Sequence, residues 1–286
     1  MEWINKSKVL IVGLGLMGGS YARALTRMGY HVDAIDASEE SIKYALDNKI
    51  IVRGSASADK TIIEEADAII FALYPKIIVD WIKDNQKYFK PSIILTDVTG
   101  IKNEIVYSIQ DVLREDVEFI AAHPMAGREV YGVQNSDERI FRDANYIVVP
   151  TDKNSEEAIE WCKNLGQILG FRNVAVLSPI EHDRMIAYVS QLTHCIAVAL
   201  MTCHDNHHLA DYTGDSFRDL TRIARINENM WSELFFMNKE LLLEEMDCFI
   251  NEIISIRDMI EKEDASKLKE KMRLSTKRRA LFDKKL

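Results

Sequence analysis

The stretch KVLIVGLGLMGGSYARALTRM, residues 8–28, decides the fold of this 286-residue chain. The β-branched, apolar run Lys8–Val12 predicts a buried strand, and the glycine-rich segment 13–18 follows it directly. Gly19 to Met28 then has the sequence of a helix. Strand, glycine turn and helix in this order are typical of a dinucleotide-binding unit, in which the helix start offers N–H groups to a pyrophosphate.

Each glycine of the motif has a physical task at its position. Gly13 permits the tight turn after the strand, Gly15 lets the backbone approach a pyrophosphate, and Gly18 lets the helix pack closely on the strand. Leu16 and Met17 complete the loop, so we expect all five residues to contact the cofactor. A glycine-rich turn without a ligand is the alternative, and the position of the motif between strand and helix counts against it.

The second strand, His31–Ile35, ends at an acidic residue. Asp36 lies 18 residues after Gly18, where a carboxylate can accept hydrogen bonds from the adenosine ribose hydroxyls. A negative charge there also repels a 2′-phosphate, and no arginine follows it at once. The sequence therefore predicts NAD rather than NADP.

The first part of the chain alternates short β-branched runs with longer mixed segments. This alternation predicts an α/β fold of the Rossmann type, a doubly wound parallel sheet covered by helices on both faces. We expect a helix over Ser155–Leu169, and strands at Lys8–Val12, His31–Ile35, Ala68–Leu73, Ile93–Asp97, Glu118–Ala121, Tyr146–Val149 and Asn173–Val176.

The sequence pattern changes at residue 178. Ser178-Pro179-Ile180-Glu181 has the sequence of a capping box with proline at the first helical position, and no proline follows it. Apolar residues then recur at helical spacing. We therefore expect two domains, residues 1–178 binding the dinucleotide and an all-α domain over 179–286. The helix Leu241–Ile260 is apolar over a wide arc, which predicts a homodimer.

Composition excludes several classes of protein. The formal net charge of -9 argues against nucleic-acid binding, because a protein that neutralises phosphates needs a basic face. The chain start lacks a signal-peptide pattern, and polar residues within 185–201 argue against a membrane span. The cysteines are well separated and indicate neither disulfides nor a metal, which favours a reducing cytoplasm: Cys162, Cys195, Cys203 and Cys248.

A histidine follows the expected strand Glu118–Ala121. Segment 122–127, with the sequence AHPMAG, should lie at the carboxyl edge of the sheet, where doubly wound folds bind their ligands. An imidazole with a pKa near ~6.5 suits a base that accepts a hydroxyl proton near neutrality. The alternative is a histidine that only satisfies hydrogen bonds in a turn. His123 is therefore a candidate general base.

Three segments together resemble the prephenate dehydrogenase family: DVTGIK at 97–102, HPMAGRE at 123–129 and FRDLTRIARINENMW at 217–231. The resemblance covers nearly the whole chain, from Val9 to about Lys239. It implies NAD-dependent oxidative decarboxylation of prephenate to 4-hydroxyphenylpyruvate in tyrosine biosynthesis. It also implies that His123 takes the ring hydroxyl proton as hydride leaves for NAD.

The resemblance also assigns neighbours of the catalytic histidine. Glu129 is implied as a nearby substrate-site group. The family pattern has a serine where this chain has Gly100, so Thr99 is expected to assist at the hydroxyl instead, with a water molecule as the alternative. Arg128 stands where a small polar residue is expected, and it could alter how a substrate carboxylate or amine is recognised.

Substrate-binding residues are also implied in the helical part. Arg222 is implied to bind the ring carboxylate, since a guanidinium can hold a carboxylate bidentately and does not deprotonate. Asp219 could orient it, although an Asp and an Arg three apart can also form an ordinary surface pair. His194 is implied to bind substrate, and Trp231 to reach the partner subunit's site.

Other functions remain open at this stage. Arogenate dehydrogenase is the nearest alternative, because arogenate carries an amino group where prephenate has a keto group. A β-hydroxyacid or imine reductase should have a lysine in segment 183–201, which contains none, and an NAD-sensing protein should lack His123 and Arg222. The segment HDNHH at 204–208 is expected to be a loop end rather than a metal site.

Overall fold

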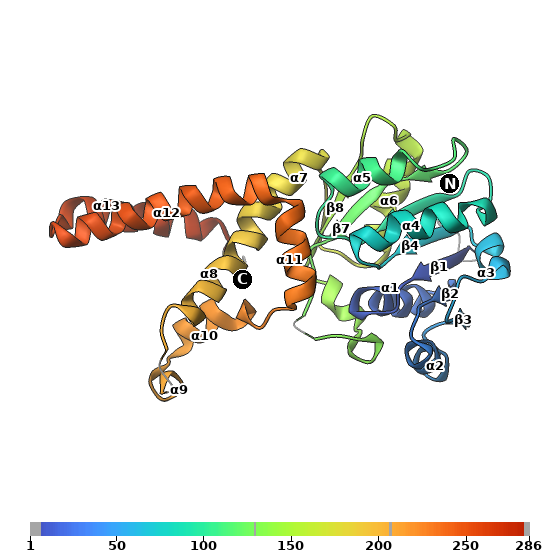
Figure 1. Cartoon of the computed structure of the whole chain (residues 1–286), viewed down its shortest axis with the longest axis horizontal. Helices are drawn as coiled ribbons and strands as arrows, with labels where there is room; N and C mark the ends of the chain where they lie inside the picture. Colours follow the sequence, from blue (N-terminus) through green and yellow to red (C-terminus); the bar gives the residue numbers. More distant parts are fainter. Residues whose placement is uncertain (1–6, 129, 206–207, 283–286) are drawn as a thin grey trace. The chain divides into compact units, whose positions relative to one another are not determined.

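The computed structural model describes residues 7–128, 130–205 and 208–282; Glu129 and His207 therefore lie outside the described residues. A six-stranded, all-parallel sheet has the order β3-β2-β1-β4-β5-β6 (Figure 1). Its strands are β1 (Lys8–Val12), β2 (His31–Ile35), β3 (Arg53–Ser55), β4 (Ala68–Phe71), β5 (Ile94–Asp97) and β6 (Glu118–Phe119). The predicted doubly wound Rossmann-type sheet is confirmed.

Side chains of β1 alternate between two apolar clusters. Val9 and Ile11 belong to the cluster that includes helices α1 and α2, whereas Leu10 and Val12 belong to the cluster that includes α3, α4 and α5. The sheet is therefore covered on both faces, as expected for parallel strands. The helices of this part are α1 (Leu16–Arg27), α2 (Glu39–Asp47), α3 (Lys60–Glu65), α4 (Pro75–Asn85), α5 (Asn103–Gln110) and α6 (Glu156–Ile168).

A second sheet differs from the sequence prediction. It contains β7 (Ala121–Pro124), β8 (Asn145–Val149) and β9 (Asn173–Val176), and β7 runs antiparallel to β8. We expected His123 just beyond the strand, at the carboxyl edge of the main sheet, but it lies inside β7, opposite Ile147. The chain changes sheet at Ile120, whose N–H donates to the Leu95 carbonyl, so the strand expected at 118–121 is divided.

Helices follow from residue 179. The predicted capping box is present, because the Ser178 and Glu181 side chains cap each other's backbone N–H groups. The described elements are α7 (Pro179–Ile186), the π-helical turn η4 (Ala187–Leu192), α8 (Thr193–Thr202), α9 (Leu209–Tyr212), α10 (Asp215–Thr221), the 3₁₀ turn η5 (Arg222–Ala224) and α11 (Glu228–Met237).

One expectation about this region was wrong. Polar residues within 185–201 do not disqualify it as a span, because Pro179–Thr202 is long and apolar enough by length and composition to cross a membrane. Only 28% of its most apolar window is buried within the chain. A single such helix is weak evidence, since helices of water-soluble proteins pass the same test.

The chain divides into two compact units, Met1–Asn238 and Lys239–Leu286. The first contains both sheets and the helices through α11. The second contains α12 (Lys239–Glu261) packed on α13 (Ala265–Arg279). The boundary expected at residue 178 stays a prediction, because helices α7 to α11 group with the sheets by contact.

Candidate active site

The glycine loop has the shape that a pyrophosphate requires. Gly13 has φ of 101°, and a Cβ there would collide with the Ala72 carbonyl. A Cβ on Gly18 would collide with the Gly13 carbonyl oxygen. A Cβ on Gly15, in contrast, would meet no heavy atom within 4 Å. Two glycines thus fix the turn, and the third leaves an open side that a ligand can approach.

Helix α1 begins at this open side. The Gly19 N–H donates to the Gly15 carbonyl at 3.0 Å, so the helical bonds begin there and the N–H groups of Leu16 and Met17 have no acceptor within the helix. The first turn contains no acidic side chain. Because these N–H groups and the helix dipole favour an anion, the loop fits a dinucleotide pyrophosphate.

Asp36 is held beside the loop by two backbone groups. Its carboxylate accepts from the Leu14 N–H at 2.6 Å and from the Ser38 N–H at 2.8 Å. The carboxylate has further lone pairs available for ribose hydroxyls. Its fixed position at the end of β2 fits the adenosine part of NAD.

A chain of three hydrogen-bonded side chains starts at His123. Its Nδ1 lies 2.9 Å from Nε2 of His182, and Nδ1 of His182 lies 2.7 Å from the Asp183 carboxylate. Asp183 also accepts from the N–H groups of Lys102 and Asn103 at 2.9 and 2.7 Å, at the start of α5. His182 and Asp183 are buried, at 0% and 1% exposure.

The order of donors in this chain fixes the proton positions. The Asp183 carboxylate only accepts, so Nδ1 of His182 carries a proton and its Nε2 accepts from the Nδ1–H of His123. Nε2 of His123 is then the unprotonated nitrogen, and the ring is only partly buried. The arrangement leaves Nε2 of His123 free to accept a proton. Asp183 fixes the tautomer through His182, as the carboxylate of a catalytic triad fixes the tautomer of its histidine.

Electrostatics keep both imidazoles neutral. Burial, followed by the nearby His182 and Lys102, lowers the pKa of His123 well below its ordinary value. Burial also lowers the pKa of His182, although Asp183 opposes this shift. A neutral His123 at physiological pH can accept a proton without first losing one.

A buried ion pair lies beneath the histidines. Nζ of Lys102 donates to Asp97 at 2.6 Å and to the Thr99 hydroxyl at 3.1 Å, and the Thr99 hydroxyl also bonds to Asp97. Asp97 further accepts from the Ala122 N–H at 3.1 Å, next to His123. The ion pair therefore joins β5 to β7 at the base of the site.

Thr99 is only 5% exposed, and its hydroxyl bonds to Asp97 and accepts from Lys102. The family resemblance implied that this hydroxyl assists at the substrate hydroxyl. That role stays a prediction.

Gly100 borders the imidazole of His123. A Cβ at this position would lie 3.7 Å from Leu234 Cδ1 and 4.0 Å from His123 Cε1, which is ordinary contact. A small side chain at position 100 would therefore stand beside His123 without a clash.

The helical part places His194 and Trp231 against each other. Nδ1 of His194 donates to the Ser190 carbonyl at 2.8 Å, and its ring centroid lies 3.7 Å from that of Trp231. His194 follows the π-helical turn η4, a feature that is frequent at functional sites. Trp231 was expected to reach a partner subunit, and within the chain it packs on His194.

Residues of η4 also hold α11 in place. Gln191 donates to the Leu234 carbonyl at 2.8 Å and accepts from Asn238 at the same distance. Asn238 donates in addition to the Asp183 carbonyl at 2.9 Å. Helix α11, which contains Leu234, is thereby connected by hydrogen bonds to the segment that carries His182 and Asp183.

Three further predicted site residues, Arg128, Asp219 and Arg222, are exposed on the first unit. Arg222 is exposed in η5, and Asp219 is exposed on α10. Arg128 follows β7 and donates to Asp137 at 3.0 Å. Glu129 lies outside the described residues. The substrate roles of these residues stay predictions.

Sequence reasoning missed His182, Asp183 and Lys102. The signal was present, since His182 and Asp183 directly follow the capping box on α7. Their pairing with His123 spans 59 residues and could not be seen before the fold was known. Lys102 was noted only as part of the 97–102 segment.

An open glycine loop, a carboxylate at the end of the second strand and a neutral histidine on one doubly wound fold are the features of an NAD-dependent dehydrogenase. The family model for the prephenate dehydrogenase nucleotide-binding domain matches residues 21–175, and the model for the prephenate dehydrogenase dimerization domain matches residues 178–274. The chain belongs to the prephenate dehydrogenase family.

Individual relatives support the same family assignment. Prephenate dehydrogenase of Bacillus subtilis is 32% identical over 272 residues, covering 92% of this chain and 72% of the relative. Cyclohexadienyl dehydrogenase of Zymomonas mobilis is 26% identical over 280 residues, covering 95% and 94%. The structure of Aquifex aeolicus prephenate dehydrogenase with hydroxyphenyl propionate and NAD+ has a TM-score of 0.89 at 28% identity, covering 99% of this chain and 100% of that one.

Proposed function

We propose that this chain catalyses the NAD-dependent oxidative decarboxylation of prephenate to 4-hydroxyphenylpyruvate, a step toward tyrosine. The observation that carries the proposal is the hydrogen-bonded chain from His123 through His182 to Asp183, which leaves Nε2 of His123 as a neutral proton acceptor. Family membership supplies the substrate class.

NAD, when bound, would supply the hydride acceptor, and the chain supplies position and proton transfer. As hydride leaves the hydroxyl-bearing ring carbon, Nε2 of His123 takes the hydroxyl proton, and the ring carbon becomes a ketone. The bond to the ring carboxylate then breaks, and its electrons enter the ring as CO2 leaves. The ring becomes a phenolate, which the protonated His123 can reprotonate. Aromatisation drives the sequence forward.

Charged residues of the helical part are proposed to hold the substrate. Arg222 binds the ring carboxylate bidentately, and Asp219 orients its guanidinium. His194, packed on Trp231, contacts the side-chain end of the substrate. Arg128 and Glu129 follow the strand of the catalytic histidine and are proposed to recognise the same end.

Arogenate is the second candidate substrate. It differs from prephenate only in the side chain, where an amino group replaces the keto group, so the chemistry at the ring is the same. The resemblance to a cyclohexadienyl dehydrogenase favours testing both. Arg128 disfavours the ammonium of arogenate if it lies near the side chain.

The test is NADH formation by the purified protein with prephenate and with arogenate, each with NAD and with NADP. The proposal predicts turnover of prephenate with NAD and a preference of at least about tenfold over NADP, because Asp36 repels a 2′-phosphate. Absence of turnover with every pair would contradict it.

We further propose that the protein acts as a cytoplasmic homodimer. The match to a dimerization domain supports this, as do exposed apolar residues along α12: Leu243, Ile250, Ile253, Ile254 and Ile260. All four cysteines are free, which accords with a reducing compartment. Sedimentation equilibrium measures the mass directly, and a monomer at micromolar concentration contradicts the dimer.

A further inference from the structure

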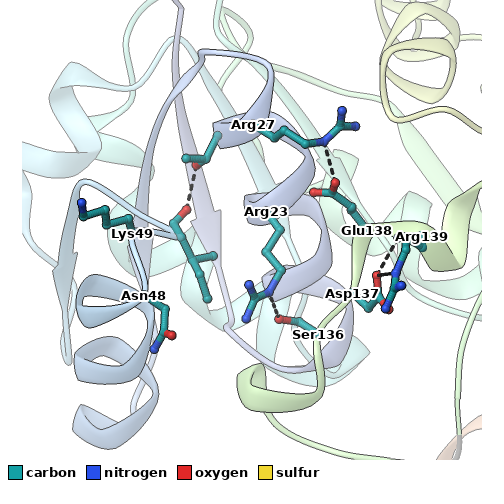
Figure 2. A pocket seen from close by; sticks show the side chains of 10 residues that line it. Arg23, Arg27, Asn48, Lys49, Ser136, Asp137, Glu138 and Arg139 are labelled. Atoms are coloured by element: carbon teal, nitrogen blue, oxygen red, sulfur yellow. Dashed lines mark hydrogen bonds and ion pairs between the residues drawn. The ribbon is translucent and has the colours of Figure 1, made fainter.

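A pocket of about 490 Å³ opens on the first unit (Figure 2). Helix α1 forms one wall, the turn after α2 forms the second, and segment Ser136–Arg139 forms the third. The volume lies within the range of small-molecule sites. No residue of the candidate active site lines it.

Cations predominate in the lining. Arg23, Arg27, Lys49 and Arg139 face the pocket with two acids, Asp137 and Glu138, which leaves a formal charge of +2 by subtraction. The whole chain has a net charge of -9. The pocket is therefore a local positive region on an acidic protein, and such a region attracts anions.

Both acids are already paired. Arg27 Nε lies 2.5 Å from Glu138, and Arg139 lies 2.7 Å from Asp137, which also accepts from Arg128. The paired arginines hold the pKa of Asp137 far below its usual range, so it stays ionised. Arg27 and Arg139 are thus neutralised within the pocket wall.

Two cations have no such acid. Arg23 donates its Nε–H to the neutral hydroxyl of Ser136 at 2.8 Å, which leaves its charge unmatched. Lys49 is exposed in the turn after α2. Among the residues that the structure describes, no ion pair joins Arg23 or Lys49 to an acidic group. These two cations are the ones available to a ligand.

The walls are held by contacts that do not depend on a ligand. Ser136 is 8% exposed, and a Cβ on Gly19 would press within 2.8 Å of it, so this wall sits directly on α1. The Asp137 N–H donates to the Ser20 hydroxyl at 3.0 Å. On the other side, the Thr26 hydroxyl donates to the Ile50 carbonyl at 2.7 Å. The backbone segments that carry Arg23 and Lys49 are therefore held in place without a ligand.

We propose that this pocket binds a small oxyanion of at least two negative charges, such as a phosphate monoester or a polycarboxylate, through Arg23 and Lys49. A guanidinium and an ammonium are the usual partners of such groups. The site is separate from the pyrophosphate loop, because Arg23 lies eight residues beyond Gly15 and hence about 12 Å along α1.

Inorganic phosphate is the first probe, titrated calorimetrically into protein saturated with NAD, at constant ionic strength maintained with KCl. NAD fills the glycine loop, so phosphate cannot be measured there by mistake. The proposal predicts saturable binding to one site per chain. Lys49→Gln and Arg23→Gln should each weaken it at least about fivefold. The matched control Lys60→Gln removes an exposed lysine on α3 and should leave the affinity for phosphate within twofold of wild type.

Citrate under the same conditions distinguishes the two ligand classes, since tighter binding of citrate than of phosphate indicates a polycarboxylate site. Lys49 is exposed in a loop, so its variant keeps the test valid should Arg23→Gln fail to fold. Heat that is linear in concentration for both anions, or equal affinity in wild type and Lys49→Gln, overturns the proposal.

Discussion

At the residue scale, the reactivity of His123 depends on a carboxylate two side chains away. Asp183 fixes the proton of His182, and His182 fixes the proton of His123. The two histidines lie on different segments, and the backbone N–H groups of Lys102 and Asn103 hold the carboxylate in place. Position and proton location are thus set by the same hydrogen bonds.

Asp183→Asn should separate these effects. An amide cannot accept from all three N–H groups, so the tautomer of His123 is no longer enforced, and kcat should fall between about 10²- and 10⁴-fold. The KM for NAD should change less than twofold. Glu181→Gln is the control: it removes a nearby exposed carboxylate and should keep kcat within twofold. Equal kcat values in the two variants would contradict the role given to Asp183.

The wild-type pH profile follows from the same site. Because the pKa of His123 is lowered well below 6.5, kcat/KM should stay constant from neutrality until the pH falls well below that value.

Gly100 offers a second residue-scale prediction. A side chain there would contact His123 at ordinary distance, so Gly100→Ser should keep the melting temperature and retain kcat/KM within about threefold. Gly100→Leu should fill the space above the imidazole and lower kcat/KM at least about 10²-fold. Steady-state kinetics with thermal unfolding checks both. Full activity in the leucine variant would show that substrate does not occupy this space.

At the element scale, the glycine turn and β1 agree with the sequence because their signals are local. The strand at 118–121 does not, because its division between two sheets depends on pairing with Leu95 and Val149. β3 was missed because only three residues, one a glycine, form it. The histidine chain likewise required the fold, since α7 brings His182 to β7.

The turn η5 carries its own prediction. Arg222→Gln should raise the KM for prephenate roughly 10- to 100-fold while kcat falls less than fivefold, because a charge-assisted bond to the ring carboxylate is lost. Arg225→Gln, three residues further along and also exposed, is the matched control. Its KM for prephenate and its kcat should stay within twofold of wild type. Initial-rate kinetics decides, and an unchanged KM in the Arg222 variant removes it from the carboxylate site.

At the scale of the whole molecule, the neutral histidines link stability to pH. The folded-state pKa values of His123 and His182 are lowered, so the unfolded chain binds protons first as the pH falls below about 6.5. The free energy of unfolding should therefore decrease between pH 6.5 and 5, by at most about 1.4 kcal/mol per pH unit for each histidine.

Urea unfolding at fixed protein concentration measures this slope. The double variant His123→Asn/His182→Asn should show a shallower decrease over the same pH interval, because neither position then titrates. An identical change of unfolding free energy with pH in wild type and double variant would mean that other groups control stability at acid pH.

The central claim is that His123 is the proton acceptor of an NAD-dependent dehydrogenase acting on prephenate. The most direct measurement is single-turnover NADH formation by His123→Asn with saturating prephenate, beside the NAD dissociation constant of the same variant. The rate should be at least about 10³-fold lower than in wild type, with NAD affinity within twofold of wild type. A near-native rate in this variant would contradict the mechanism.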